Sequence, residues 1–545
     1  MSDLPFFSFG LDSEAHRPDI PAMGAKGAGL VAMHGIGLPV PPGFILGTAL
    51  GAKLAGDAAE LSDDVLDIVQ SAVVKLEQAT GRTFGGVETP LLLSVRSGAS
   101  ASMPGMMDTV LDLGLNKQTV EALAKETGDG RFAWDSYRRF IQSFSQVVLE
   151  LDDDPYEMAL EDMRERCGVE ADSDLPAEAL KKLAGQFLEI VEGSAPKPFP
   201  QDVTVQLSLA LVSVFKSWNT RRAQTFREMN GISHEDGTAA TVQAMVFGNR
   251  DERSCSGVYF TRNPSTGANK PYGEYIANAQ GEDVVSGVRT PMELTEESRL
   301  AAMSENPSME KLLPEAYAQL LEAGETLETH FGDMQEIEFT VESGRLYLLQ
   351  TRTAKRNPKA ALRVAVEMAR DEMISKAAAV SRCTEEMLAP MLVVKADPSG
   401  VQLFAKGLPA SPGAVSGEIA FTSDTAIKAA EAGRSAILVR PETDPRDVHG
   451  MNAACGILTS RGGMTSHAAV VARGMGKPCI TAAMGLKIDT DAGICSSAGQ
   501  TLQAGDTITI DGGTGMAYPG ELPVVKPKPD GDLATLLEWK TEADN

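Results

Sequence analysis

His467 stands in the segment GGMTSHAAVVARGMG, between two glycines and an alanine-rich stretch. Thr465 and Ser466 are good helix-capping residues, and residues 468–473 favour a helix, so we expect His467 in its first turn. Free backbone N–H groups and the positive end of the helix dipole favour an anion there. Because a neutral imidazole is a nucleophile, the pattern predicts a histidine that carries a phosphoryl group. A histidine that only caps or packs the helix would give the same local pattern.

Two glycine-rich stretches near the start of the chain carry basic side chains. GAKGAGL places Lys26 at the centre of a predicted glycine-rich loop, and SVRSGASASMPGMMDT places Arg96 before a second loop around Gly105. Glycines let the backbone approach phosphates, and lysine and arginine supply positive charge to them. We therefore predict phosphate contacts, with an ordinary turn at Lys26 and a surface ion pair at Arg96 as the alternatives.

The segment MQEIEFTVESGRLYLLQTR has two alternating runs on either side of residues 342–344, which predicts a β-hairpin. Glu336 and Glu338 are two apart and should face the same way. The hairpin would bring Gln350 roughly opposite Glu336, with Arg352 beside them. Oxygen ligands of this kind suit magnesium bound together with nucleotide phosphates. An edge strand kept soluble by its acidic residues explains the same residues equally well.

Composition excludes several function classes. The 545 residues include 49 Lys and Arg against 75 Asp and Glu, and the formal charge of −26 opposes binding to nucleic acid or anionic membranes. The chain shows no signal peptide and no apolar run long enough for a bilayer, so we predict a cytoplasmic protein. Its six cysteines are scattered without metal-ligand spacing, which argues against a disulfide framework or a zinc site.

Changes in residue composition and in the spacing of apolar residues predict several structural segments along the chain. We expect strands joined by functional loops in residues 1–115, a helical insertion over about 116–235, and strands again before the hairpin. Residues 356–400 read as a helical linker and residues 401–522 as a compact α/β domain. Residues 523–545 form a proline-containing tail that ends in one short amphipathic helix.

Longer motifs resemble the pyruvate phosphate dikinase family, whose members use phosphoenolpyruvate. They include LPVPPGF, SVRSG, SMPGMMDT, DSYRRFIQ, FTRNPSTG, NAQGEDVVSG, LLQTR and TSRGGMTSH, in that order along the chain. The resemblance implies an α/β and α+β multidomain fold. Residues 1–355 would be an ATP-grasp nucleotide-binding domain with the helical insertion, and residues 401–522 a swivelling β/α phosphohistidine domain.

The resemblance also implies roles for individual residues. His467 matches the phosphorylated catalytic histidine, and Thr465 matches a hydroxyl residue that is a regulatory phosphorylation site in some plant relatives. The other matched positions are nucleotide-site residues (Lys26, Arg96, Gly105, Arg139, Thr266, Glu282 and Arg352) and a metal and phosphate cluster (Glu336, Glu338 and Gln350). Glu336 stands where the family has aspartate, which keeps the charge and adds a methylene.

The implied function is an ATP-dependent phosphotransferase with Mg2+ as cofactor and ATP and inorganic phosphate as substrates. Family members continue into a (β/α)8 barrel that binds pyruvate and phosphoenolpyruvate, whereas this sequence stops where that barrel would begin. We therefore expect only the ATP and phosphate half-reaction, a monomer, and a separate barrel subunit as a candidate partner. The alternatives are a non-catalytic nucleotide-binding regulatory or partner protein, and a phosphocarrier to another acceptor.

Overall fold

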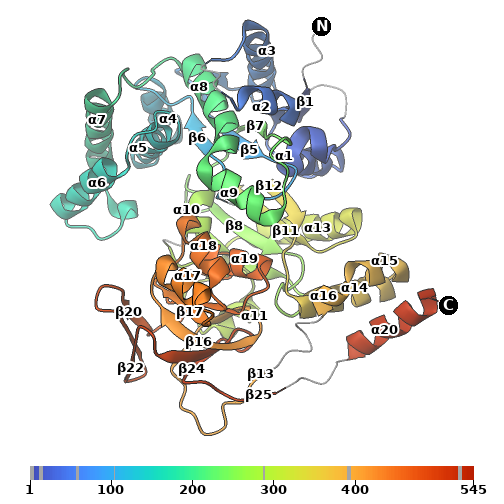
Figure 1. Ribbon diagram of the computed structural model, residues 1–545. Helices are drawn as coiled ribbons and strands as arrows, with labels where there is room; N and C mark the ends of the chain where they lie inside the picture. The colour runs from blue at the N-terminus through green and yellow to red at the C-terminus, as the bar shows by residue number, and fades with distance from the viewer. Residues whose placement is uncertain are drawn as a thin grey trace. The chain divides into compact units, whose positions relative to one another are not determined.

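The computed structural model describes residues 5–11, 16–56, 60–103, 105–286, 289–388, 395–525 and 531–544. Two compact units share the chain (Figure 1). Unit 1 comprises Met1–Arg250 with Tyr347–Gln350, and unit 2 comprises Asp251–Leu346 with Thr351–Asn545. Each unit has its own sheets and its own buried side chains, so each is considered by itself.

An antiparallel five-stranded sheet forms the centre of unit 1, in the order β1-β2-β7-β5-β6. Strand β7 lies between β2 and β5 and is buried along its whole length. The strands are β1 (Phe6–Phe9), β2 (Gly43–Leu46), β5 (Leu93–Gly98), β6 (Thr109–Leu113) and β7 (Ala239–Ala244), with a separate short pair β3 (Thr83–Phe84) and β4 (Pro90–Leu91).

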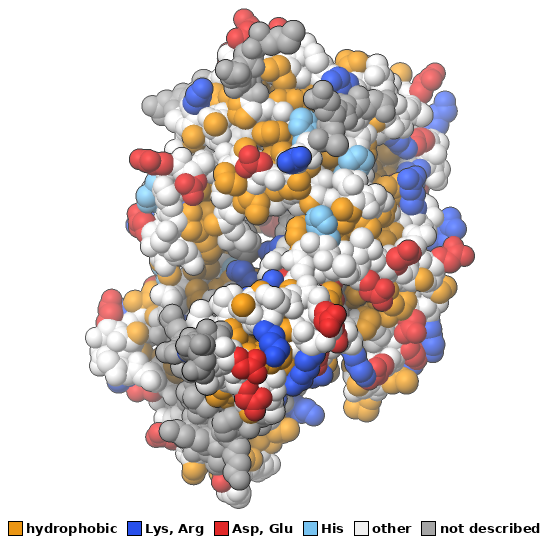
Figure 2. Space-filling model, turned by 90° about the vertical axis from the view of Figure 1, so that its right-hand side faces the viewer, with side chains coloured by type: hydrophobic (Ala, Val, Ile, Leu, Met, Phe, Trp, Pro, Cys, Tyr) orange, Lys and Arg blue, Asp and Glu red, His pale blue; other side chains and the backbone are white. Residues whose placement is uncertain are grey.

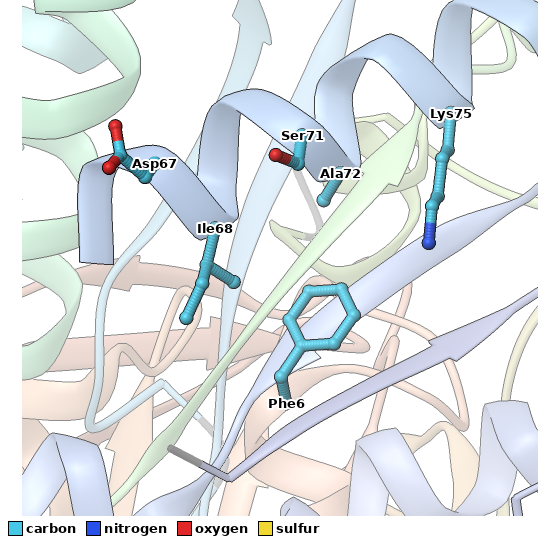
Figure 3. Close-up of a pocket in the computed structure, with 6 residues that line it drawn as sticks. All are labelled: Phe6, Asp67, Ile68, Ser71, Ala72 and Lys75. Atoms are coloured by element: carbon cyan, nitrogen blue, oxygen red, sulfur yellow. The ribbon is translucent and has the colours of Figure 1, made fainter. Parts of the chain in front are cut away.

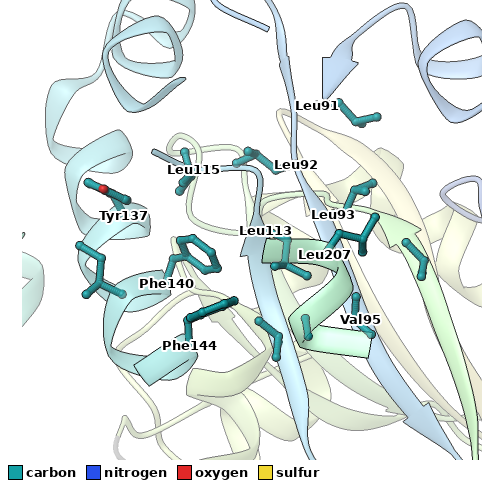
Figure 4. Close-up of a cluster of buried hydrophobic side chains, with 14 of the residues drawn as sticks. Leu91, Leu92, Leu93, Val95, Leu113, Leu115, Tyr137, Phe140, Phe144 and Leu207 are labelled. Atoms are coloured by element: carbon teal, nitrogen blue, oxygen red, sulfur yellow. The ribbon is translucent and has the colours of Figure 1, made fainter. Parts of the chain in front are cut away.

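Helices supply most of the remaining core of unit 1, and the residues that were expected to form the helical insertion are largely helical. Figure 4 shows Leu207 of one helix beside Leu93 of strand β5, and Phe140 and Phe144 of another helix toward Leu113 of strand β6, all of them buried. Their aromatic rings lie on one helix face because four residues make about one turn. The helices are α1 (Ile20–Gly35), α2 (Thr48–Leu54), α3 (Asp63–Thr80), α4 (Thr119–Thr127), α5 (Gly130–Val147), α6 (Asp154–Cys167), α7 (Ala177–Ser194), α8 (Val203–Lys216) and α9 (Arg221–Asn230).

The expected glycine-rich loop around Lys26 is wrong, because this segment lies within helix α1. Gly24 alone leaves the helical conformation, with φ at 71°, and it kinks the helix. The next residue donates its backbone N–H to the carbonyl of Ala99 over 2.8 Å. A Cβ at Gly24 would lie 2.0 Å from the carbonyl oxygen of Gly98. The glycine therefore allows close approach of two backbones at a helix kink.

A second sheet, in the order β10-β9-β8-β11-β12, contains the predicted hairpin. Ser343 and Gly344 form its two-residue turn, with φ at 50° and 85°, as a type I′ turn requires. The strands are β8 (Cys255–Phe260), β9 (Tyr272–Ala277), β10 (Met292–Glu293), β11 (Gln335–Glu342) and β12 (Arg345–Thr353). The neighbouring helices are α10 (Gly281–Ser286), α11 (Glu296–Ala301), α12 (Met309–Leu312) and α13 (Pro314–Phe331).

Helices follow the hairpin as predicted, and the C-terminal helix packs against them. Leu536 and Trp539 of that helix join Leu362 and Ala379 in one buried cluster. An ion pair between Arg370 and Asp532, at 3.0 Å, lies at its edge. These helices are α14 (Pro358–Arg370), α15 (Lys376–Arg382), α16 (Glu385–Leu388) and α20 (Gly531–Asp544).

A mixed eight-stranded sheet forms the α/β part that was predicted from residue 401, in the order β14-β24-β23-β16-β17-β18-β19-β15. Four adjacent strands, β16 to β19, run parallel. Its strands are β14 (Ala405–Lys406), β15 (Leu408–Ser411), β16 (Ala414–Ala420), β17 (Ala436–Arg440), β18 (Gly456–Thr459), β19 (Cys479–Thr481), β23 (Thr507–Asp511) and β24 (Met516–Pro519). The helices α17 (Ser423–Glu431), α18 (Val448–Ala453) and α19 (His467–Gly474) accompany it. Smaller sheets pair β13 (Lys395–Ala396) with β25 (Val524–Val525), and β20 (Lys487–Asp489), β21 (Ile494–Ser497) and β22 (Gln500–Gln503) with one another.

Across the described residues, every helix is too short or too polar to cross a membrane. Figure 2 shows Lys and Arg side chains lying among Asp and Glu side chains on the face that it presents. All six cysteines are free thiols.

Gly24→Ala should disturb the Lys26 segment, because the added methyl would meet the Gly98 backbone and φ is positive there. We expect a loss of about 2 kcal/mol or more in the free energy of unfolding, measured with urea. Gly35→Ala in the same helix is the control, since a Cβ there meets nothing within 4 Å. Equal stability of the two variants would contradict the kink as a constraint.

Candidate functional site

His467 begins helix α19, directly after the loop that follows strand β18. The parallel strands β17 and β18 end side by side, and the loops that leave them are hydrogen-bonded to each other. Ser460 donates its N–H to the carbonyl of Arg440 over 3.2 Å, and Arg461 donates to the carbonyl of Pro441 over 2.8 Å. The sheet therefore places the histidine at the carboxyl edge of two parallel strands, where ligands commonly bind in α/β proteins.

The environment of His467 favours the neutral ring. Burial lowers the pKa of the imidazole, and the carboxylates of Asp444 and Asp447 oppose that shift without reversing it. Its Nε2 atom is buried and has no hydrogen-bond partner within the described part of the chain. A neutral ring with an unengaged nitrogen is the state in which a histidine can act as a nucleophile.

Ser466 is the N-cap residue of α19, but its side chain makes no capping hydrogen bond. The prediction that Thr465 and Ser466 cap the helix is therefore wrong for their side chains. Thr465 instead donates its hydroxyl to Oε2 of Glu274 over 3.3 Å. The helix start is fixed by tertiary contacts of the preceding loop rather than by its own cap.

The loop before His467 is held through the peptide groups of Met464. Its N–H donates to Oε1 of Glu274 over 2.6 Å. Its carbonyl accepts from Nη2 of Arg473 over 2.5 Å, and Nη1 of the same arginine donates to the carbonyl of Ala410 over 3.2 Å. A Cβ at Gly463 would lie 2.3 Å from Oε2 of Glu274, so this glycine lets the carboxylate reach the loop.

Glu274, on strand β9, is the residue of this site that the sequence analysis missed. Burial raises the pKa of its carboxyl to about 7, while the Met464 N–H and Thr465 hydroxyl oppose the rise. Glu293 stands directly opposite it on strand β10 and adds to the rise. The available signal was one acidic residue within the otherwise apolar run YGEYIA.

The predicted phosphate contacts Lys26 and Arg96 come together in unit 1. A Cβ at Gly98 would lie 3.6 Å from Cβ of Lys26, and Gly98 is two residues beyond Arg96 on strand β5. Arg96 donates from Nη1 to the carbonyl of Leu349 over 3.1 Å, next to the buried Gln350. The two basic side chains therefore belong to one local surface of unit 1.

The acidic residues of the hairpin lie beside an arginine, as predicted. Glu336 is 3% exposed and forms an ion pair of 2.5 Å with Arg352. Burial lowers the pKa of Arg352, but Glu336 and Glu338 outweigh it and leave that pKa raised. Among the described residues no group of three or more His, Cys, Asp or Glu side chains is arranged for a metal. The carboxylate oxygens of Glu336 and Glu338 are nonetheless of the kind that magnesium takes, since magnesium uses few protein ligands when it binds with nucleotide phosphates.

The other predicted residues make contacts of their own. Arg139 donates to Oδ2 of Asp135 over 3.3 Å on helix α5. Thr266 belongs to a turn in which its N–H donates to Asn263 over 2.9 Å. Glu282 is exposed on α10, and Gly105 is exposed with φ at 69°.

Neither of the surface pockets identified in the described residues includes a predicted site residue. The pocket in Figure 3, of about 290 Å³, lies between helix α3 and Phe6 of strand β1. The other, of about 420 Å³, lies among Asp108, Lys216, Arg222 and neighbouring residues. The candidate residues therefore lie in the loop before His467 and in helix α1 around Lys26 rather than in either pocket.

Two stretches of the chain match known protein families. Residues 57–311 and 293–373 match the family described as pyruvate phosphate dikinase, AMP/ATP-binding domain. The chain belongs to the pyruvate phosphate dikinase family. Residues 433–515 also match the mobile domain of PEP-utilising enzymes, and this stretch contains His467.

Similar proteins span the same region. The chain is 49% identical to a pyruvate, phosphate dikinase of Rhizobium meliloti over 535 residues, 98% of this chain and 60% of that protein. It is 45% identical to the pyruvate, phosphate dikinase of Clostridium symbiosum, covering 95% of this chain and 58% of that protein. The chloroplastic pyruvate, phosphate dikinase 1 of Zea mays is 43% identical, with 98% and 55% covered. The chain thus spans about three-fifths of the length of these dikinases.

Glu274→Gln should remove the part of the pH dependence of the free energy of unfolding that comes from titration of this carboxyl. Its pKa is raised from 4.5 to about 7 in the folded chain, so its stabilising effect is full below pH 4.5 and is lost as the pH rises through 7. We expect the free energy of unfolding of the parent chain to fall by about 1 kcal/mol per pH unit in that window, relative to the variant. Thermal unfolding at several pH values measures this. Glu521→Gln, at an exposed position, is the control and should retain the parent profile.

Proposed function

We propose that this chain is an ATP-dependent phosphotransferase that phosphorylates His467. The observation that carries the proposal is the half-buried imidazole at the start of α19, whose pKa is lowered by burial and whose buried Nε2 has no hydrogen-bond partner among the described residues. Membership of the pyruvate phosphate dikinase family supports ATP as the phosphoryl donor. We assign an ATP-grasp architecture to residues 1–355 and a swivelling phosphohistidine domain to residues 401–522 as part of this proposal.

The reaction would proceed in two transfers. His467 attacks the β-phosphorus of ATP, the bond between the α- and β-phosphates breaks, and AMP leaves from a pyrophosphoryl-histidine. Inorganic phosphate then attacks the terminal phosphorus, which leaves phosphohistidine and releases pyrophosphate. The first step moves a pyrophosphoryl group from oxygen to nitrogen. The second moves the terminal phosphoryl group from one oxygen to another, and neither step involves a redox change.

Lys26 and Arg96 would hold the nucleotide phosphates during the first transfer. Both carry positive charge, and Arg96 reaches the strand that bears Gln350. Such charges act by stabilising the negative charge that spreads over the transferring oxygens. Glu336, Glu338 and Gln350 would hold Mg2+, which supplies charge neutralisation at the phosphates.

The later fate of the phosphoryl group remains a prediction. The relatives are dikinases by name, and this chain matches about three-fifths of their length. Four expectations stay predictions: restriction to the ATP and phosphate half-reaction, a separate barrel subunit, a monomeric state, and Thr465 as a regulatory site. A phosphocarrier to another acceptor would use the same first step.

A nucleotide-binding regulatory protein is the second candidate. Its support is the ion pair between Glu336 and Arg352, which engages a carboxylate that the metal would otherwise use. Such a protein would bind ATP without forming AMP or phosphohistidine. The two candidates therefore differ in products, which the following experiments measure.

His467→Ala should abolish acid-labile phosphorylation and AMP formation, because the nucleophile is gone. Nucleotide binding should stay nearly unchanged, since the phosphate contacts belong to unit 1. Radiolabelled ATP followed by mass spectrometry of the peptide measures the label. His449→Ala, at an exposed histidine of α18, is the matched control. Label that persists in the His467 variant would refute the assignment, and ATP binding without products in the parent chain would favour the regulatory protein.

Lys26→Ala and Arg96→Ala should each slow AMP formation by about tenfold to a hundredfold, the effect of losing one charged hydrogen bond. Calorimetric ATP titration and a coupled AMP assay separate weaker binding from slower transfer. Lys53→Ala, at an exposed lysine of α2, should behave as the parent chain. Unchanged AMP formation in both variants would remove Lys26 and Arg96 from the phosphate site.

A further inference from the structure

The loops around His467 contain more unpartnered polar groups than its ring alone. Oγ1 of Thr443 and Oγ of Ser466 are buried, and they have no hydrogen-bond partner within the described residues. Their residues are 8% and 7% exposed. Buried hydroxyl groups without partners are costly, so such a group in a folded protein calls for an explanation.

These hydroxyls lie on the two loops that meet beside His467. Thr443 is in the loop after β17, and Ser466 immediately precedes His467 in the loop after β18. Hydrogen bonds from Ser460 and Arg461 to the first loop join the two. The carboxylate of Asp444, the residue after Thr443, interacts electrostatically with the His467 ring. The unpartnered groups therefore gather on the histidine side of the sheet edge.

Positive charge is present on the same loop. Arg440, at the end of β17, donates from Nη1 to the carbonyl of Phe421 over 3.2 Å, and its Nη2 lies 3.7 Å from Oδ2 of Asp447. Its Nε is buried and has no partner in the described part of the chain. Asp447 is itself anchored by the hydroxyl of Ser423, at 2.8 Å, so it fixes the arginine as well as the loop.

The start of α19 adds further donors. Val470 makes the first intrahelical hydrogen bond, to the carbonyl of Ser466 over 3.0 Å. The N–H groups before it have no intrahelical acceptor, and the Ser466 side chain does not cap them. Hydroxyls, an arginine and helix N–H groups are together the usual donor set for a tetrahedral oxyanion.

We propose that Thr443 and Ser466, backed by Arg440, form a holding site for the phosphoryl group carried on Nε2 of His467. The site belongs to the phosphohistidine domain itself, so it would accompany the group once the nucleotide has left. Identification of the anion as a phosphoryl group rests on the proposed function. Both hydroxyls would donate to phosphoryl oxygens and slow the loss of the group to water.

The experiment loads His467 with phosphoramidate, which needs no nucleotide site. The Nε2 lone pair forms a bond to phosphorus, the P–N bond of phosphoramidate breaks, and ammonia takes up the proton that the ring loses. The phosphorylated chain is freed of reagent, and its decay is followed by 31P NMR and by mass spectrometry. Loading with Mg-ATP and phosphate is run in parallel. Failure of ATP loading alone would count against the proposed function and leave this test in place.

Thr443→Val and Ser466→Ala should each shorten the half-life of phosphohistidine about tenfold, the effect of one lost hydrogen bond to a charged group. Both should also shift the 31P resonance. Thr443→Ser, which restores a hydroxyl, should recover most of the lifetime. Thr501→Val, at an exposed threonine of β22, is the control and should match the parent chain. Circular dichroism checks that each variant is folded.

Two outcomes would overturn the proposal. Unchanged half-life and resonance in folded Thr443→Val and Ser466→Ala chains would leave the hydroxyls without this role. Titration of the unphosphorylated chain with inorganic phosphate provides the other arm. Phosphate binding that Thr443→Val abolishes, without any effect on phosphohistidine lifetime, would assign the site to free phosphate instead.

Discussion

Two hydrogen bonds to the peptide groups of Met464 are the constraint on which the candidate site depends. Its N–H is taken by Glu274, and its carbonyl by Arg473, so the loop is fixed from two sides three residues before His467. Both partners are ionisable and buried, and each would be costly to bury without such a partner. Removal of either side chain would therefore leave one peptide group of Met464 without its partner and loosen the loop before the histidine.

These hydrogen bonds to Met464 also explain why the start of helix α19 needs no side-chain cap. A capping hydrogen bond from Ser466 would satisfy helix N–H groups and would remove them from any anion. With the loop fixed through Met464 and Thr465, the N–H groups and the Ser466 hydroxyl remain available beside the ring. The loop is held by tertiary contacts, which leaves these local donors without a capping role.

Local patterns predicted the elements that local forces determine. The hairpin followed from two alternating runs around a glycine turn, and the helical insertion followed from apolar residues at helical spacing. The position of His467 at a helix start followed from an alanine-rich stretch after small polar residues. Each of these signals lies within about twenty residues, so no knowledge of distant contacts was needed.

The parts that the sequence did not predict depend on contacts between distant segments. Gly24 looks like a loop glycine, and only its approach to the Gly98 backbone makes it a kink within a helix. Glu274 lies 190 residues before the peptide that it binds, so nothing near it indicates its partner. Gly463 illustrates the same limit, because its small size is required by that carboxylate and not only by an anion. A glycine beside a candidate nucleophilic histidine can therefore be required by protein packing, by ligand approach or by both, and the sequence pattern alone does not separate them.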